Sequence, residues 1–502
     1  MKRTTSYLRS AALIGVLAAS FGSVANAADL RFALADDPDA LDTKSNRAQT
    51  GLTVLTVMCD RLMWTDSKLT ILPGLAKSWS WSDDGKELTL DLIEGAKFQD
   101  GTPFDAEAVK INIERNKEKG SQRADDISTV ASVEAVSPTK VLIKVSEPSA
   151  QLLSKLADRV GIVFSPTVIK ELGDNLGRAP VCVGPYKFVE RVAQDRIVLE
   201  KDANYYDAAK YAFDKVTFRI IPDDAVRLAN LQSGELDLME KLDPSNAATV
   251  AEDKNLQIIP MTVLNNQTVV LNLNREGPMK DPKVREALEM ALDRQAIVDV
   301  AFAGQYQAGN QFVAPDSPFY NADFPIPARD PEKAKALIAE AGLQEPVPLK
   351  ILVPNRPLSV RVGEMMQAMG TDAGFAITLD VVDFATTLKL TDEGNFESWG
   401  PIGPQFANDL DTVAYPVLHS TGGRNLSRYK SPEMDKLLEA TRTATDPAKR
   451  MELFKEASAL AVKDRPVLYL YHQKPLFVAT SKLKGFHATG DGFVKLDGMT
   501  ID

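Results

Sequence analysis

Apolar and polar residues alternate along several short segments of the chain, as they do in β-strands that bury one face. Within residues 86–93 leucine stands at every second residue from Leu88 to Leu92, and residues 141–145 repeat this period with valine and isoleucine. Apolar segments of similar character predict further strands at residues 213–221, 268–273, 349–353 and 377–382.

Three helices are predicted from a repeated pair of residues, an aspartate followed by a proline. Aspartate is a common N-cap because its carboxylate accepts a hydrogen bond from a free backbone N–H, and proline suits the first helical position. At Asp281, Asp330 and Asp446 the pair precedes a helix-like segment. After Asp281 an apolar stripe predicts one helix that ends at Gly304, and Gly342 ends the helix after Asp330. Because strands and helices alternate, we expect an α/β fold.

The first 27 residues have the pattern of a bacterial export signal. A cationic start with three Lys or Arg residues precedes a mostly apolar run over residues 11–24, and Ala25-Asn26-Ala27 fits the small-x-small site of signal peptidase. The run is shorter than the roughly 20 residues that a membrane-spanning helix needs. We therefore expect cleavage after Ala27 and a periplasmic protein that starts at Ala28.

The charge and the length of the mature chain limit its partners and its architecture. Removal of the signal takes away three positive charges, so the formal net charge changes from −11 to −14. An acidic chain repels nucleic acids and anionic lipid surfaces, and we expect neither as a partner. The remaining 475 residues exceed what one hydrophobic core supports, so at least two domains are expected.

Two cysteines, Cys59 and Cys182, remain in the mature chain. An oxidising compartment permits one disulfide between them. Two buried free thiols fit the sequence equally well. The spacing of the two residues does not decide between these alternatives.

Residues 72–115 contain a series of motifs in a distinctive order. The segment reads LPGLAKSWSWSDDGKELTLDLIEGAKFQDGTPFDAEAVKINIER. Further motifs follow at residues 183–188 (VGPYKF), 204–206 (NYY), 234–237 (GELD) and 284–288 (VREAL). In this order the motifs resemble the extracellular solute-binding proteins that serve dipeptide, oligopeptide and nickel importers, family 5 of such receptors. The resemblance covers almost the whole mature chain.

The resemblance implies a two-lobed periplasmic-binding-protein fold of type II, in the large form with an extra subdomain in lobe I. Its implied limits are 28–273 for lobe I, about 70–190 for the extra subdomain, 274–472 for lobe II and 473–502 for a return to lobe I. The same fold puts Cys59 on an early helix of lobe I and Cys182 beside the Gly184-Pro185 turn, which makes contact between them plausible.

The function implied by the resemblance is that of the periplasmic receptor of an ABC importer. Such a receptor is a monomer that closes around a small peptide or peptide-like solute. It then delivers the solute to the permease and ATPase complex at the inner membrane.

No catalytic or cofactor-binding motif stands out in the sequence. It lacks a Gly-x-Ser-x-Gly elbow, a His-Glu-x-x-His helix, a phosphate-binding Gly-rich loop and a Cys-x-x-Cys pair. We therefore expect no enzyme activity and no cofactor, and a secreted hydrolase is the least favoured alternative. A nickel or metal-chelate receptor is the closer alternative, because His419 follows Asp409 and Asp411 and imidazole suits nickel. One histidine without a His-rich tract favours a polar residue near the surface of the lobe instead, and no metal site is expected.

The stretch from Trp399 to Asp411 resembles a loop of peptide-binding members that carries an aspartate for the ligand's α-amino group. When Asp409 and Asp411 are aligned with the two later acids of that loop, Phe406 takes the position of the amine-pairing aspartate. A buried ammonium without a counter-charge is strongly disfavoured, so peptides with a free amine are expected to bind poorly. Two alternatives stay open: Asp409 or Asp411 takes the amine, or Phe406 packs in the core while the two acids cap a helix.

Four further residues are candidates for ligand contact. Arg424, in the turn at residues 421–425, has a guanidinium that suits a carboxylate, and Arg123 suits one from the other lobe. Asn425 resembles a family asparagine near the cleft, and Trp399 either forms a wall of the pocket or packs in the core. Because arginine is usually a solvated surface residue, a surface role is the alternative for Arg424 and Arg123.

Overall fold

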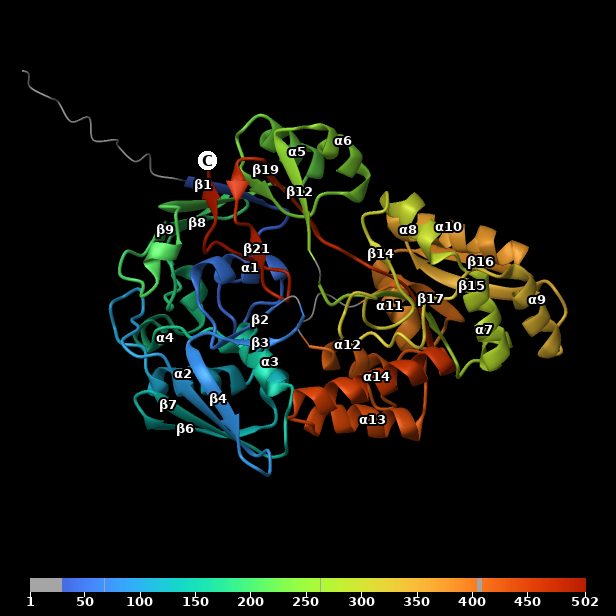
Figure 1. The fold of residues 1–502 in the computed structure, drawn as a ribbon, viewed down its shortest axis with the longest axis horizontal. Coiled ribbons are helices and arrows are strands. Elements are labelled where there is room, and N and C mark those ends of the chain that lie inside the picture. The colour runs from blue at the N-terminus through green and yellow to red at the C-terminus, as the bar shows by residue number, and fades with distance from the viewer. Residues whose placement is uncertain (1–28, 67, 262, 404–408) are drawn as a thin grey trace, which may run out of the picture.

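The computed structural model describes residues 29–66, 68–261, 263–403 and 409–502, and two large β-sheets organise this part of the chain. The seven-stranded sheet has the order β12 (Leu256–Pro260), β19 (Leu476–Thr480), β11 (Leu238–Met239), β1 (Asp29–Leu34), β10 (Lys215–Ile220), β9 (Arg196–Lys201) and β8 (Tyr186–Val192). The six-stranded sheet has the order β14 (Gln307–Ala308), β18 (Val467–His472), β13 (Gln267–Leu271), β17 (Ser398–Ile402), β15 (Val347–Pro354) and β16 (Phe375–Val382). We call the parts built on these sheets lobe I and lobe II; Figure 1 shows lobe I on the left and lobe II on the right.

Lobe I buries both faces of its sheet. On one face Phe32 lies against Phe218 and Phe477, with ring centroids 5.4 and 6.2 Å apart. This core also contains α1 (Gln49–Met58), α2 (Ala106–Lys117), α3 (Leu152–Leu156) and α4 (Pro166–Leu172). The opposite face is covered by α5 (Asp224–Gln232) and α6 (Ala247–Glu252).

A small sheet extends lobe I toward lobe II. Its order is β4 (Ala76–Trp81), β5 (Glu87–Leu92), β7 (Lys140–Val145) and β6 (Val130–Ser137). The alternation at residues 86–93 and 141–145 is confirmed, since Leu88, Leu90 and Leu92 are buried while their neighbours are not. The hairpin of β2 (Met63–Thr65) and β3 (Ile71–Pro73) lies beside it. Lobe I is completed by two C-terminal pairs, β20 (Leu483–Lys484) with β23 (Thr500–Ile501) and β21 (His487–Ala488) with β22 (Val494–Lys495).

Lobe II holds its sheet between two layers of helices. One layer consists of α7 (Pro282–Ala291), α8 (Arg294–Phe302), α9 (Pro331–Glu340) and α10 (Pro357–Asp372). The other consists of α11 (Phe384–Asp392), α12 (Asp411–Leu418), α13 (Pro432–Thr443) and α14 (Pro447–Asp464). Sheet and helices together form the expected α/β architecture, and the predicted strands at residues 349–353 and 377–382 are β15 and β16.

The three Asp-Pro signals each begin a helix, as predicted. The carboxylates of Asp281, Asp330 and Asp446 accept hydrogen bonds from the backbone N–H groups of Lys283, Lys333 and Lys449, and the following prolines stand at the first helical positions.

The expectation of one helix from Asp281 to Gly304 is wrong, because α7 ends at Ala291 and α8 starts at Arg294. The Asp293 carboxylate accepts a hydrogen bond from the N–H of Ala296 and starts a second helix. The preceding Leu292 is extended and interrupts the first.

The chain passes twice between the lobes, and the two passages lie side by side. One links β12 to β13 and the other links β18 to β19, and the N–H of Met261 donates to the carbonyl oxygen of Pro475 at 2.9 Å. Because β13 belongs to the sheet of lobe II, the first passage lies before Gln267 and the expected limit of lobe I at residue 273 is too late.

Two long-range links tie lobe I together. Cys59, directly after α1, forms a disulfide with Cys182, whose sulfur lies 2.03 Å away. The fully buried Arg61 donates to the Asp491 carboxylate at 2.7 Å and to the carbonyl oxygen of Ala157 at 2.8 Å. Both links join segments that are far apart in the sequence, and the C-terminal residues are thereby part of the core of lobe I.

His472, at the second passage, predicts a pH dependence of stability. Burial disfavours the imidazolium and lowers the pKa of His472 to about 4, although its Nδ1 contacts the carbonyl oxygen of Asn265. Below pH 6.5 the unfolded chain binds a proton that the folded chain does not, so the free energy of unfolding decreases as the pH falls toward 4. In His472→Asn this decrease should be smaller by up to about 3 kcal/mol, measured by urea titrations at pH 7 and pH 4.

The matched control is His487→Asn. The hydrogen bond to Asp497 raises the pKa of His487, so this histidine stabilises the folded chain at low pH and its loss should act in the opposite direction. Identical pH dependence in the wild type and in His472→Asn would contradict the prediction.

Candidate functional site

The lobes touch where α3 and the residues before it meet the helices of lobe II. The Ser154 hydroxyl donates to a carboxylate oxygen of Asp409 at 3.0 Å. The N–H of Ala150 donates to the carbonyl oxygen of Arg442 at 2.8 Å. Figure 1 shows α3 beside α13 and α14 at this junction. The two hydrogen bonds join lobe I to lobe II at this junction.

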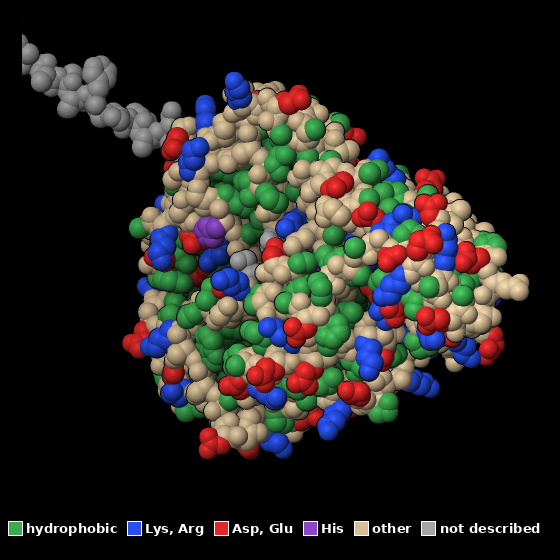
Figure 2. All heavy atoms as spheres, turned by 45° about the vertical axis from the view of Figure 1, so that its right-hand side comes forward, with side chains coloured by type: hydrophobic (Ala, Val, Ile, Leu, Met, Phe, Trp, Pro, Cys, Tyr) green, Lys and Arg blue, Asp and Glu red, His purple; other side chains and the backbone are tan. Residues whose placement is uncertain are grey.

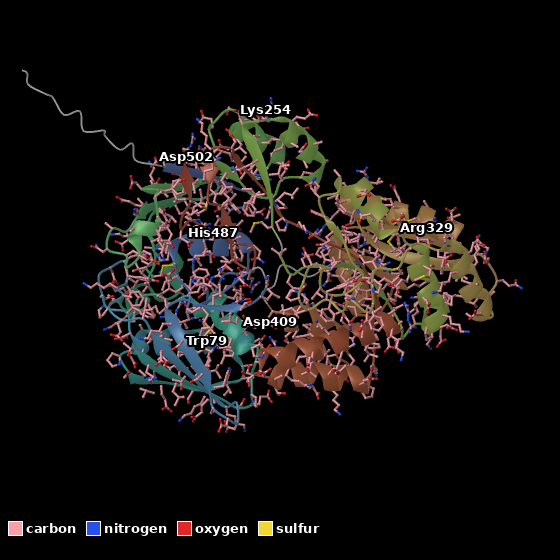
Figure 3. The ribbon with its side chains drawn as sticks, viewed as in Figure 1. Trp79, Lys254, Arg329, Asp409, His487 and Asp502 are labelled. Carbon is pink, nitrogen blue, oxygen red and sulfur yellow. A yellow bond between two sulfur atoms is a disulfide. The ribbon has the colours of Figure 1, made fainter. Side chains whose placement is uncertain are left out.

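Two cavities lie between the lobes at this junction, and we name them by their walls. The apolar cavity has a volume of about 370 Å³ and is lined by Lys68, Leu69, Thr70, Ile71, Trp79, Ala150, Leu153, Ser154, Pro318, Phe319, Asp409, Leu410, Ala444, Thr445, Pro447, Arg450 and Met451. The charged cavity has a volume of about 600 Å³ and is lined by Asp125, Asp126, Ser128, Thr129, Glu147, Pro148, Ser149, Gln151, Lys155, Asp411, Thr412, Tyr415, Pro416, Glu439, Arg442 and Thr443. Figure 3 shows Trp79 and Asp409 close to the junction of the lobes.

Asp409 is a buried acid whose hydrogen-bonding capacity is already used. Both of its oxygens accept from the Arg450 guanidinium, at 2.7 and 2.8 Å, and one accepts from the N–H of Asp411, the first residue of α12. Burial opposes ionisation of Asp409, but the charge of Arg450 outweighs it and holds the pKa of Asp409 below its usual value. Asp409 therefore acts as a structural ion pair at the start of α12.

Asp411 is paired in the same way with a second arginine. The Nε and Nη2 atoms of Arg442 donate to its two oxygens at 2.8 and 3.0 Å. The guanidinium of Arg442 also stacks on the ring of Tyr415, 3.5 Å from the centroid. Neither Asp409 nor Asp411 is arranged to receive an ammonium group from a ligand, because each already faces a guanidinium.

The charged cavity has more acidic than basic side chains. Its cations are Lys155 and Arg442, and its acids are Asp125, Asp126, Glu147, Asp411 and Glu439. Burial opposes protonation of Lys155, but the Asp126 carboxylate at 3.1 Å raises the pKa of Lys155 above its usual value. Because Asp125, Glu147 and Glu439 are exposed, solvent screens their charges.

Arg123 lies next to the charged cavity but does not line it. Its Nη1 is 3.0 Å from the Asp126 carboxylate, and its Nε has no hydrogen-bond partner among the described residues. Arg123 therefore brings a further positive charge behind one wall of the cavity.

Arg424 and Asn425 take structural roles that the sequence analysis did not anticipate. Pro416 lacks an N–H, so α12 leaves the carbonyl oxygen of Thr412 without its helical partner, and Nη2 of Arg424 donates to this oxygen at 3.0 Å. The Asn425 side chain donates to two backbone oxygens and accepts two further hydrogen bonds within its own turn. Asn425 has no capacity left for a ligand.

The remaining candidates are placed as follows. Trp399 packs in the core of lobe II, only 5 % exposed, and lines neither cavity. His419 is 4 % exposed and stacks on Tyr415, so the expected surface position is wrong. Phe406 lies outside the described residues.

Within the described ranges no group of three His, Cys, Asp or Glu side chains is arranged to hold a metal ion. No helix in those ranges is long and apolar enough to cross a membrane. The predicted export signal, residues 1–27, lies outside the described residues.

Comparisons with known proteins identify a family from the sequence and a shared fold from the structure. The model of the bacterial extracellular solute-binding proteins, family 5 (middle region), matches residues 70–425. The glutathione-binding protein GsiB of Salmonella paratyphi A is 28% identical over 486 residues, which cover 94% of this chain and 93% of that protein. HbpA2 from Haemophilus parasuis has a similar structure, with a TM-score of 0.86, 23% identity and coverage of 94% and 100% of the two chains. A dipeptide-binding protein from Pseudoalteromonas sp. SM9913, solved with Met-Leu, gives a TM-score of 0.75 at 21% identity, with 94% and 100% covered.

Proposed function

The chain belongs to the bacterial extracellular solute-binding proteins of family 5, and from this membership we propose that it captures a small peptide between its lobes. Proteins of this family are the periplasmic substrate-binding components of ABC importers. The observation that carries the proposal is that residues of both lobes line the two cavities at their junction. A receptor that closes on its ligand needs a site that both lobes complete.

A peptide is favoured because the walls combine charged and apolar areas. The relative GsiB binds glutathione, which is itself a tripeptide. The charged cavity offers hydrogen-bonding groups for a peptide backbone. A free amine is not required in this proposal, since Asp409 and Asp411 are both occupied by arginines.

The remaining parts of the proposal follow from the sequence. Residues 1–27 direct export to the periplasm, and the mature monomer presents its closed form to the permease and ATPase complex. It carries out no catalysis and binds no nucleic acid. On the face that Figure 2 shows, acidic and basic side chains are interspersed, so no continuous positive surface for a polyanion is present there.

Calorimetry with a panel of peptides tests this function. Glutathione, a dipeptide and its N-acetylated form are titrated into protein purified without denaturation, with nickel and a nickel–histidine complex as controls. We expect at least one peptide to bind with a Kd in the micromolar range or tighter, and acetylation to change the affinity less than tenfold. A receptor with a buried carboxylate for the amine loses several kcal/mol on acetylation.

Two results would count against the proposal. Binding of the nickel complex without any peptide binding would favour the metal-chelate receptor, and turnover of a peptide would favour a hydrolase. Loss of dipeptide binding on acetylation would contradict only the statement about the amine.

A further inference from the structure

The apolar cavity is lined mainly by apolar side chains that come from both lobes. Lobe I contributes Leu69 from the turn between β2 and β3, Ile71 from β3, Trp79 from β4 and Leu153 from α3. Lobe II contributes Phe319, Leu410 and Met451. Most of these side chains are only partly buried, so they expose apolar surface to the cavity. An apolar group that entered would remove this surface from water.

The polar groups of the cavity do not offer a charge to a ligand. Asp409 and Arg450 neutralise each other across 2.7 and 2.8 Å, and Ser154 donates to Asp409. Lys68 is exposed. The walls therefore favour an uncharged, apolar occupant, and a volume of about 370 Å³ holds an aliphatic or aromatic side chain.

We infer that the apolar cavity accepts an apolar side chain of the captured peptide, and that filling it favours the closed arrangement of the lobes. The inference rests on the proposed function, because it assumes that a peptide is the ligand. Filling the cavity favours closure because its walls come from both lobes. A side chain in the cavity contacts both lobes at once, whereas in an open form it contacts only one, so it binds the closed form more tightly.

Calorimetry with matched tripeptides tests the inference. The probes are trialanine and three peptides in which leucine replaces alanine at one position, each with a free and an acetylated N-terminus. In the wild type at least one leucine peptide should bind about tenfold or more tightly than trialanine, the effect expected for burying the larger side chain.

Two variants assign that preference to the cavity. Thr445→Phe fills the cavity and should bring the leucine preference to within twofold, whereas Thr378→Phe, on the exposed side of β16, should leave it unchanged. Met451→Gln keeps the length of the side chain but makes the wall polar, and should reduce the preference at least threefold. This second variant guards against a steric effect of phenylalanine on closure.

The outcomes separate the inference from the function on which it rests. Equal binding of leucine and alanine peptides, or a preference that survives both cavity variants, would overturn the inference and leave the proposed function intact. Failure of every tripeptide and of the earlier panel to bind would overturn the proposed function, and the inference with it.

Discussion

Removal of the Cys59–Cys182 disulfide should lower the free energy of unfolding by about 2 to 5 kcal/mol, one of the largest effects that a single covalent change can have here. The bond joins residues 123 apart in the sequence, and closing so long a loop restricts the unfolded chain considerably. Both cysteines are fully buried in the core of lobe I, so the native geometry does not depend on lobe II.

Guanidinium titrations of the wild type and of the double variant Cys59→Ala/Cys182→Ala measure this effect. Each single alanine variant serves as a control that leaves one free thiol. Peptide affinity should change little in the double variant, because the bond lies within one lobe and does not bridge the cleft. Two reactive thiols in the denatured, non-reduced wild type would contradict the assignment of the bond.

Asp409→Asn should destabilise the protein by about 3 to 5 kcal/mol. The substitution leaves the Arg450 guanidinium, whose side chain is 17 % exposed, without its counter-charge. It also weakens the acceptor for Ser154, the residue that links α3 to lobe II. We therefore expect loss of stability together with weaker peptide binding, since the same carboxylate takes part in the contact between the lobes.

A matched control lies on α14, the helix that carries Arg450. Glu452→Gln removes an exposed acid that pairs with Lys449, and should cost less than about 1 kcal/mol. The double variant Asp409→Asn/Arg450→Met should recover part of the loss, because no unpaired charge remains. If Asp409→Asn and Glu452→Gln have equal effects in thermal and urea unfolding, the buried pair does not have the role we assign to it.

Local signals in the sequence predicted the elements of the fold well. The carboxylates of Asp281, Asp330 and Asp446 act within three residues of themselves, so their effect is visible in the sequence. The break between α7 and α8 was also readable, since Asp293 is an N-cap of the same kind without a following proline. The passage before Gln267 could not be read from the sequence. Its position depends on the pairing of β13 with β17 and β18, which lie more than 100 residues further on.

The candidate site was predicted far less well than the fold. Asp409 and Asp411 were recognised as important, but their partners Arg450 and Arg442 lie on helices whose packing no local pattern reveals. The cavities are lined by residues within 68–155 and 318–451, which are far apart in the sequence, so no motif marks them.

Arg424 makes a contact that the sequence does not reveal, although its partner is only 12 residues away. A proline inside an apolar helix signals a free carbonyl group, and Pro416 does leave that of Thr412 free. The hydrogen bond from Arg424 to this carbonyl oxygen can be inferred only once the course of the turn after α12 is known.

The return of the chain into lobe I has a consequence for how the protein is made. A newly synthesised or exported polypeptide emerges with its N-terminus first, yet β19 lies inside the seven-stranded sheet, between β12 and β11, and Arg61 needs Asp491. Lobe I is thus incomplete until nearly the last residue has emerged. The strands of lobe II's sheet all come from residues 267–472, so that sheet can be completed earlier. A chain cut short near its end would keep the sheet of lobe II and lose the lobe that begins the sequence.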